Sequence, residues 1–259
     1  RRTGDRSPAA SARGRWPLTA AGRSSWAAMT GCDTLQAQST KLWRIDMSGT
    51  KCNTAKTVAV LFVREGGLYT EGLFLPFVDP WPKSRDARNY GGPLPVVAHP
   101  PCQLWGALAL VNFKRWGGEH NRPGNDGGCF EAAKRAVDAF GGVLEHPAKS
   151  KAFKTFGISQ PHGAGWNRSG IGWVCEVWQS AYGHRANKAT WLYYVGGIDP
   201  FDLIWDRPRG THQIGFQNQR GKPRNKPTLT KAHANATPVG FSDVLIQLAL
   251  WSTHKTGEN

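Results

Sequence analysis

Short apolar runs recur along most of this chain, and each is closed by glycine, proline or charged residues. Apolar runs between such breakers are typical of strands buried in a parallel sheet, and alternating apolar and polar residues indicate a strand with one polar face. A further apolar stretch covers residues 73–78 and ends at Asp-Pro-Trp. We predict strands over residues 57–63, 95–98, 143–145, 172–178 and 189–195.

Helical spacing is clearest over residues 129–140. Apolar side chains recur there every three or four positions, and charged side chains take the opposite face. An asparagine and an aspartate just upstream can cap this helix, and Gly141–Gly142 ends it. We expect a second, apolar helix over residues 241–251, and either a helix or a lid over residues 104–116.

Strands that alternate with helices predict an α/β fold with a Rossmann-like sheet, which we assign to one domain over residues 47–259. Residues 1–46 differ, because they are rich in Arg, Ala, Ser and Gly and have no sustained periodicity. We expect a disordered basic arm or a non-native upstream segment there. Eight Lys and Arg against three Asp leave this segment at +5, so an arm that binds nucleic acid is the functional alternative.

The composition restricts the class of protein. The chain has 259 residues, 39% of them hydrophobic, and no run approaches the ~18 apolar residues of a membrane span. We therefore expect a soluble, cytoplasmic protein with no membrane partner. The five cysteines include no Cys-x-x-Cys pair, and the eight histidines show no His-Glu-x-x-His spacing. These patterns predict neither a disulfide framework nor a metal site.

The charge points to a partner. The net charge is +15 and the pI is about 10.0, and so basic a chain suggests a polyanionic partner, most often nucleic acid. Residues 207–233 carry seven Lys and Arg and no acid between them. This run is either a solvated loop or a contact surface for nucleic acid.

The main candidate for chemistry is Cys102, which follows the strand 95–98 in a Pro-Pro-Cys turn. Reactive groups of parallel sheets lie at the carboxyl ends of the strands. Two prolines stiffen the turn and hold the thiol in one place, as a nucleophile requires; the alternative is a buried structural cysteine. Glu145 ends the strand 143–145, so we expect both groups to face one pocket. Alternatively, Glu145 is a strand-end carboxylate paired with a nearby lysine.

A thiol beside a carboxyl group suits addition to a pyrimidine. The thiolate adds to C6 while an acid protonates N3, and C5 then becomes a nucleophile that takes a one-carbon group. A pyrimidine within duplex DNA must first be flipped out of the stack. Glu145 serves as this acid only if burial raises its pKa.

At these two motifs the chain resembles the cytosine-C5 DNA methyltransferase family. Residues 96–103 resemble the strand and Gly-Pro-Pro-Cys-Gln motif of the family's nucleophile, with His99 in place of glycine. Residues 143–147 resemble the Glu-Asn-Val motif, with His146 in place of asparagine. The resemblance implies methyl transfer from S-adenosylmethionine to cytosine in DNA. The catalytic residues that it implies here are Pro101, Cys102 and Glu145.

The resemblance extends upstream to the part of the chain that would bind the cofactor. Residues 61–68 resemble Leu-Phe-x-Gly-x-Gly-Gly-Leu, with Arg64 in place of the first glycine, and residues 77–81 are similar to the segment with the ribose-binding acid. These motifs and Cys102 lie within about forty residues, so we expect short or missing helices in this half. The cofactor contacts implied are Phe62, Gly66, Gly67, Asp79 and Asp86.

Downstream, residues 183–188 resemble a degenerate Gln-x-Arg-x-Arg motif, which implies that Arg185 joins the catalytic group. The place of the family's target-recognition domain is taken by residues 197–234, a small basic insertion that can hold phosphates but has few groups to read bases. We therefore expect DNA as the partner and low sequence specificity. The nucleic-acid contacts implied are Lys188, Arg207, Arg209, Arg220, Lys222 and Arg224.

Three functions remain open. The first is a DNA cytosine-C5 methyltransferase, active as a monomer in the cytoplasm of a bacterium or a phage-infected host. The second is a phage enzyme that modifies pyrimidines by the same thiol addition with a different donor or base, which Arg64 favours. The third is a non-catalytic relative that binds nucleic acid, and the intact Cys102 and Glu145 argue against it.

Overall fold

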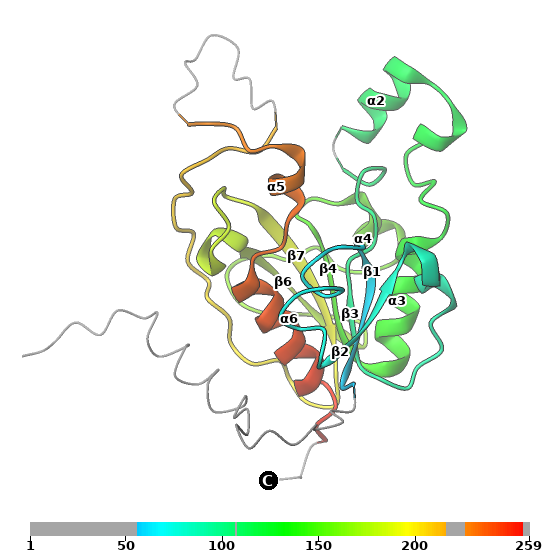
Figure 1. Ribbon diagram of the computed structural model, residues 1–259, viewed down its shortest axis with the longest axis vertical. Helices are drawn as coiled ribbons and strands as arrows, with labels where there is room; N and C mark the ends of the chain where they lie inside the picture. Colours follow the sequence, from blue (N-terminus) through cyan, green and yellow to red (C-terminus); the bar gives the residue numbers. More distant parts are fainter. Residues whose placement is uncertain (1–55, 107, 216–225, 256–259) are drawn as a thin grey trace, which may run out of the picture. The chain divides into compact units, whose positions relative to one another are not determined.

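Seven strands form one mixed sheet in the part of the chain that the computed structural model describes, residues 56–106, 108–215 and 226–255 (Figure 1). Their order across the sheet is β2-β1-β3-β4-β7-β6-β5. The strands are β1 (Val58–Val63), β2 (Val78–Pro82), β3 (Val96–Ala98), β4 (Gly142–Pro147), β5 (Asn167–Ser169), β6 (Gly172–Trp178) and β7 (Ala189–Val195).

The sheet has a parallel half and an antiparallel half. β2, β1, β3 and β4 run parallel, β7 is antiparallel to both β4 and β6, and β5 is antiparallel to β6. This arrangement confirms the predicted α/β fold and is compatible with a Rossmann-like sheet. The chain leaves β1 for β2 on one side and returns to β3 on the other. Such a reversal of strand order marks where open α/β sheets bind ligands, outside the carboxyl ends of the strands.

Helices cover both faces of the sheet. α3 (Cys129–Phe140) and α4 (Lys151–Thr155) pack on one face, and α6 (Val239–Trp251) packs on the other (Figure 1). Successive strand residues alternate between the two cores, as Val96 and Val97 of β3 do. The other helical segments are α2 (Ala109–Trp116), α5 (Lys231–Asn235) and the 3-10 helices η1 (Lys83–Arg85), η2 (Ala87–Asn89), η3 (Glu119–Asn121) and η4 (Gln179–Tyr182).

The helix predicted over residues 129–140 is confirmed as α3. Phe130 and Val137 of its apolar face are fully buried. Asp126 accepts hydrogen bonds from the N–H groups of Gly128 (3.0 Å) and Phe130 (2.9 Å), and so satisfies donors at the helix start. Gly141 ends the helix with a φ of 75°, a conformation that favours glycine.

The segment between β1 and β2 differs from the expected pattern. β2 begins only at Val78, so most of the apolar stretch over residues 73–78 is not a strand. Phe74 points into the core on the α6 face, whereas Leu73 is 67% exposed. Residues 64–77 form turns with no helix, which confirms the expectation that helices are missing from this half.

Several short elements were not predicted, and two of them lie between β4 and β6. The region 148–170 contains α4, whose start is capped by Ser150, and β5. Both are too short to show a periodic pattern. The expected arm at residues 1–46 lies outside the described residues. None of the helices in the described ranges has the length and apolar character needed to cross a membrane.

Candidate active site

The register between β3 and β4 brings the two expected motifs together. Val97 pairs with Val143 and Ala98 pairs with Leu144, so the next position along each strand places His99 beside Glu145. The Pro-Pro-Cys turn leaves β3 at this same carboxyl edge. The prediction that both strands end on one edge is therefore confirmed.

Glu145 is held by hydrogen bonds on both carboxylate oxygens. His99 Nδ1 lies 3.1 Å from Oε2, and the amide of Gln179 donates to Oε1 at 3.1 Å. The same Gln179 nitrogen also donates to the hydroxyl of Thr190 at 2.9 Å. Glu145 is only 8% exposed, so these contacts replace the water that a surface carboxylate would bind. A pairing of Glu145 with a nearby lysine of the following loop is not what the structure shows.

Glu145 is ionised in this arrangement. Burial alone raises its pKa, but the hydrogen bond with His99 and the charges of Lys188, His99 and His146 outweigh burial and lower the pKa to about 2. The condition set above, that burial should raise this pKa, is therefore not met. An ionised Glu145 has no proton of its own to donate, so a neighbouring group would have to supply one.

Cys102 lies within electrostatic reach of the same groups. Burial and the Glu145 carboxylate raise the pKa of the half-buried thiol, and the charge of Lys188 lowers it. Cys102 and Lys188 thus belong to the same group of residues as Glu145, His99 and Gln179. We call these five residues the edge cluster. The thiol is protonated at neutral pH and needs a base or the nearby ammonium group to become a nucleophile.

His146 follows Glu145 in β4 and points to the opposite face of the sheet, toward α3. Its ring packs edge-on against Phe130 of α3, with 5.1 Å between ring centroids. Burial lowers the pKa of His146 to about 4, against the opposing effects of Glu145 and of the Pro101 carbonyl. Both ring nitrogens of His146 are buried and have no hydrogen-bond partner among the described residues, so the ring is held by packing against α3. Pro101 itself is exposed.

Three of the residues expected to contact the cofactor, Phe62, Gly66 and Gly67, lie at the end of β1 or in the loop that follows it. Phe62 adopts a φ of 60° where the register of β1 shifts, an uncommon conformation for an aromatic residue that often marks functional sites. Gly66 has a φ of 68°, which favours glycine. The hydroxyl of Thr70 ties this loop together by accepting from the N–H of Gly67 at 2.9 Å.

Three residues of this loop, Arg64, Glu65 and Glu71, are charged and exposed. Arg64 and Glu71 are both exposed, and neither side chain forms a hydrogen bond or ion pair with the described residues. A Cβ atom on Gly66 would lie 3.8 Å from the Glu71 carboxylate. Glu71 is therefore an acidic group at the loop for which the sequence carried no signal.

Asp79 and Asp86, the two acids expected to contact the cofactor, both form ion pairs with arginines. Asp79 pairs in register with Ala59, near the start of β2 and away from the carboxyl edge. Its carboxylate accepts from Trp81 Nε1 at 2.8 Å and from Arg85 Nη1 at 2.5 Å. Asp86 is bound to Arg88 at 2.7 Å, which lowers the pKa of Asp86.

The residues therefore fit S-adenosylmethionine only in part. Phe62 and the glycine loop lie at the carboxyl end of β1, but both expected acids are already paired, and Arg64 stands in place of a glycine of the loop.

The basic residues downstream gather beside the edge cluster. The loop at residues 184–188 is joined to residues 210–213: the N–H of His212 donates to the Arg185 carbonyl at 2.9 Å, and the N–H of Gly210 donates to Asn187 Oδ1 at 2.6 Å. The segment that leads to α5 lies beyond the carboxyl ends of the parallel strands (Figure 1). Arg207 stacks on the ring of Trp178, 3.6 Å from its centroid.

Arg185 is placed next to this patch rather than at the thiol. Its guanidinium donates to His212 Nε2 at 2.6 Å, and the charges that act on Cys102 are those of Glu145 and Lys188. Arg209 is exposed in the same segment. The remaining expected contacts, Arg220, Lys222 and Arg224, lie outside the described residues.

Gln179 is the main functional candidate that the sequence did not reveal. It starts η4 directly after β6, is fully buried, and leaves its Oε1 without a hydrogen-bond partner among the described residues. Only its position at a strand end, at the same edge as Glu145, gave a possible signal.

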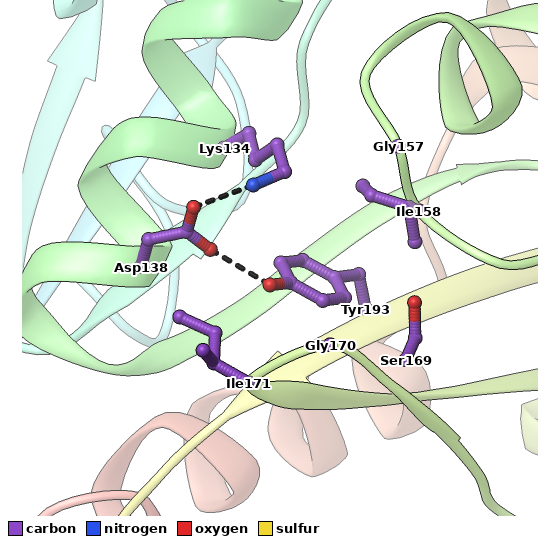
Figure 2. A pocket seen from close by; sticks show the side chains of 8 residues that line it. All are labelled: Lys134, Asp138, Gly157, Ile158, Ser169, Gly170, Ile171 and Tyr193. Carbon is purple, nitrogen blue, oxygen red and sulfur yellow. Dashed lines mark hydrogen bonds and ion pairs between the residues drawn. The ribbon is translucent and has the colours of Figure 1, made fainter.

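A surface hollow lies elsewhere, between α3, β7 and the loops near residues 158 and 170. In Figure 2, Lys134 and the hydroxyl of Tyr193 both point to Asp138, at 2.6 Å and 2.8 Å. These polar groups satisfy one another, so the hollow offers no unpaired group for a ligand.

No family model, curated protein or solved structure matches this chain. Within the described ranges, no group of histidine, cysteine, aspartate or glutamate side chains could hold a metal ion. The functional argument therefore rests on the edge cluster and the basic residues beside it.

Proposed function

We propose that this protein modifies pyrimidines in DNA, with cytosine C5 as the target, through addition of Cys102 to C6. The observation that carries the proposal is the edge cluster: a half-buried thiol, a carboxylate and an ammonium group act on one another at the carboxyl ends of β3 and β4. The resemblance of residues 96–103 and 143–147 to the methyltransferase motifs supports the same chemistry.

Each group has a part in the addition. The Cys102 thiolate, favoured by the Lys188 charge, forms a bond to C6 while one proton reaches N3 from the side of Glu145. C5 then carries the electron pair that attacks a one-carbon donor. Loss of the C5 proton, breakage of the S–C6 bond and return of the N3 proton to the side of Glu145 restore the aromatic ring and the thiolate.

The basic residues favour a nucleic acid as the carrier of the base. Arg207, Arg209 and Arg185 are exposed beside the edge cluster, where they can neutralise phosphates on either side of a flipped nucleotide. The Arg207–Trp178 stack adds an aromatic platform for a neighbouring base. A patch of this kind holds the backbone and gives little sequence specificity.

The thiol addition can be tested in the absence of a one-carbon donor. Addition at C6 labilises the hydrogen at C5, so wild-type protein should release tritium to water from duplex DNA that contains [5-³H]cytosine. Cys102→Ser should reduce this release at least ~10⁴-fold while DNA retention stays nearly unchanged. The matched control is Cys129→Ser, because Cys129 is another partly buried thiol, at the start of α3. Equal release by Cys102→Ser and wild type would disprove the nucleophile.

The donor is tested separately with labelled S-adenosylmethionine. Label in cytosine from wild type alone would identify a methyltransferase. A second candidate, the same addition with another donor or base, is favoured by the ion pairs at Asp79 and Asp86 and by Arg64. It predicts tritium release without methyl transfer. DNA retention with neither reaction would leave the non-catalytic binding protein.

A further inference from the structure

His99 stands where the methyltransferase family that the chain resembles has a glycine before the two prolines. The structure therefore has an imidazole at the catalytic edge that the addition described above leaves without a role. The inference below rests on the proposed thiol addition and concerns the source of its proton.

The His99 ring is held in a fixed position. Its Nδ1 lies 3.1 Å from Glu145 Oε2, in a pair whose side chains are 13% and 10% exposed. Tyr69, from the loop after β1, packs against the ring with 5.7 Å between centroids. The Nε2 atom is buried and has no hydrogen-bond partner among the described residues.

Proton balance shows why this pair matters. A neutral adduct forms when the thiolate adds to C6 and one proton arrives at N3. Glu145 is ionised, and its two oxygens already accept hydrogen bonds from Gln179 and His99. Glu145 thus has no proton of its own to give, whereas a hydrogen bond from His99 to the ionised carboxylate places a proton on His99 Nδ1, the nitrogen that faces Oε2.

We propose that His99 holds the proton that Glu145 passes to N3, so that the pair, rather than Glu145 alone, is the acid. A base that covers Glu145 removes water, and a neutral carboxyl beside a neutral imidazole then becomes favoured over two buried charges. The proton moves from His99 Nδ1 to Glu145 Oε2, and from there to N3 as the S–C6 bond forms. His99 recovers a proton from water. It is a positioning residue that acts through Glu145.

The other charged groups around the pair do not replace His99. Lys188 acts on Glu145 through its charge, and burial keeps His146 neutral, with neither ring nitrogen hydrogen-bonded to a described residue. Tyr69 is neutral, because burial raises its pKa, with smaller effects of Glu145 and Asp243. Among the titratable groups of the described residues, His99 is the one hydrogen-bonded to Glu145.

The test compares pH profiles of tritium release from [5-³H]cytosine DNA for wild type and His99→Gln. Glutamine keeps a hydrogen-bond donor but carries no transferable proton. In the variant, Glu145 must take its proton from the solvent. The protonated fraction of the carboxyl then falls tenfold for each pH unit above its pKa. We expect the ratio of wild-type to variant rate to grow at least ~10-fold between pH 5 and pH 7, because only the wild type has a proton-carrying group hydrogen-bonded to Glu145. The thiol titrates in both proteins and cancels in the ratio.

The outcomes separate this inference from the function beneath it. A ratio that stays constant with pH, whatever its size, would overturn the role of His99 and leave the thiol addition standing. No tritium release by wild type would overturn both. His99→Asn repeats the test if His99→Gln does not fold. His162→Gln, at an exposed histidine outside the edge cluster, is the matched control and should follow the wild-type profile at every pH.

Discussion

The strand pairs β3–β4 and β1–β2 both carry a methyltransferase-like motif at or near the carboxyl edge of the sheet, but they use their carboxylates differently. In β3–β4, Glu145 faces His99 at the edge and is coupled to Cys102 and Lys188. In β1–β2, Asp79 lies beside Ala59 and is occupied by Arg85 and Trp81. The carboxylate of the first pair is buried among reactive groups, whereas that of the second is bound to its own neighbours.

Register explains the difference. β4 has six residues, and Glu145 is its fourth, level with the first residue after β3. β2 has five residues, and Asp79 is its second. A strand rises about 3.3 Å per residue, so Asp79 stands about 10 Å short of the end of β2. The position of a carboxylate along its strand, rather than its presence in a motif, decides whether it can reach a ligand at the edge.

The largest effect is expected when the Glu145 carboxylate is removed. Glu145→Gln keeps the shape but cannot carry a proton to N3, so tritium release should fall by roughly 10²–10⁴-fold, the range for loss of an acid catalyst. The matched control is Glu176→Gln, because Glu176 is a half-buried strand carboxylate that accepts from Trp191 Nε1 at 2.8 Å. Comparable losses in both variants would show that Glu145 is only structural.

Acid unfolding should depend on the same carboxylate. Its pKa is lowered from 4.5 to about 2 in the folded protein. Its stabilising effect is thus present above about pH 4.5 and is lost as the pH falls toward 2, and it amounts to about 3 kcal/mol at most. Urea unfolding between pH 5 and pH 2.5 should show a steeper loss of stability in wild type than in Glu145→Gln. Parallel curves would contradict the lowered pKa.

Much of the sheet could be predicted because its strands are short and apolar between clear breakers. β6 and β7 match the predicted ranges residue for residue, as does α3. The apolar stretch over residues 73–78 becomes a strand only at Val78; before it, Phe74 turns into the core while Leu73 stays exposed. Apolar content without alternation or a buried run does not distinguish a strand from a packed turn.

The candidate site was only partly predictable for a related reason. Cys102 follows the apolar strand β3 and Glu145 lies in the second half of the apolar strand β4, so sheet geometry alone places them at one edge. Gln179 reaches Glu145 because β6 runs parallel to β4 two strands away, which no local pattern reveals. The pairing of Asp79 with Arg85 likewise depends on how the chain turns after β2.

A smaller effect is expected at the basic patch. Arg207→Ala should weaken binding to duplex DNA by about 3- to 10-fold and reduce the slope of log affinity against log salt by about 1, as loss of one phosphate contact does. The control is Arg168→Ala, which removes a similar stack, 4.3 Å from the Trp173 ring near the opposite end of β6. Fluorescence anisotropy at several salt concentrations measures both. Equal losses would mean that the patch at Arg207 is not the contact surface.

The smallest effect should come from Asp79→Asn. The ion pair with Arg85 is partly exposed, with side chains 28% and 43% accessible, so its loss should cost less than about 1 kcal/mol of unfolding free energy. Because Asp79 lies away from the carboxyl edge, retention of labelled S-adenosylmethionine in equilibrium dialysis should equal that of wild type. Glu71→Gln is the informative partner, since Glu71 is an unpaired carboxylate that lies next to Gly66 of the glycine loop. A loss of retention at Asp79 but not at Glu71 would restore Asp79 as a cofactor residue and remove the contrast between the two strand pairs.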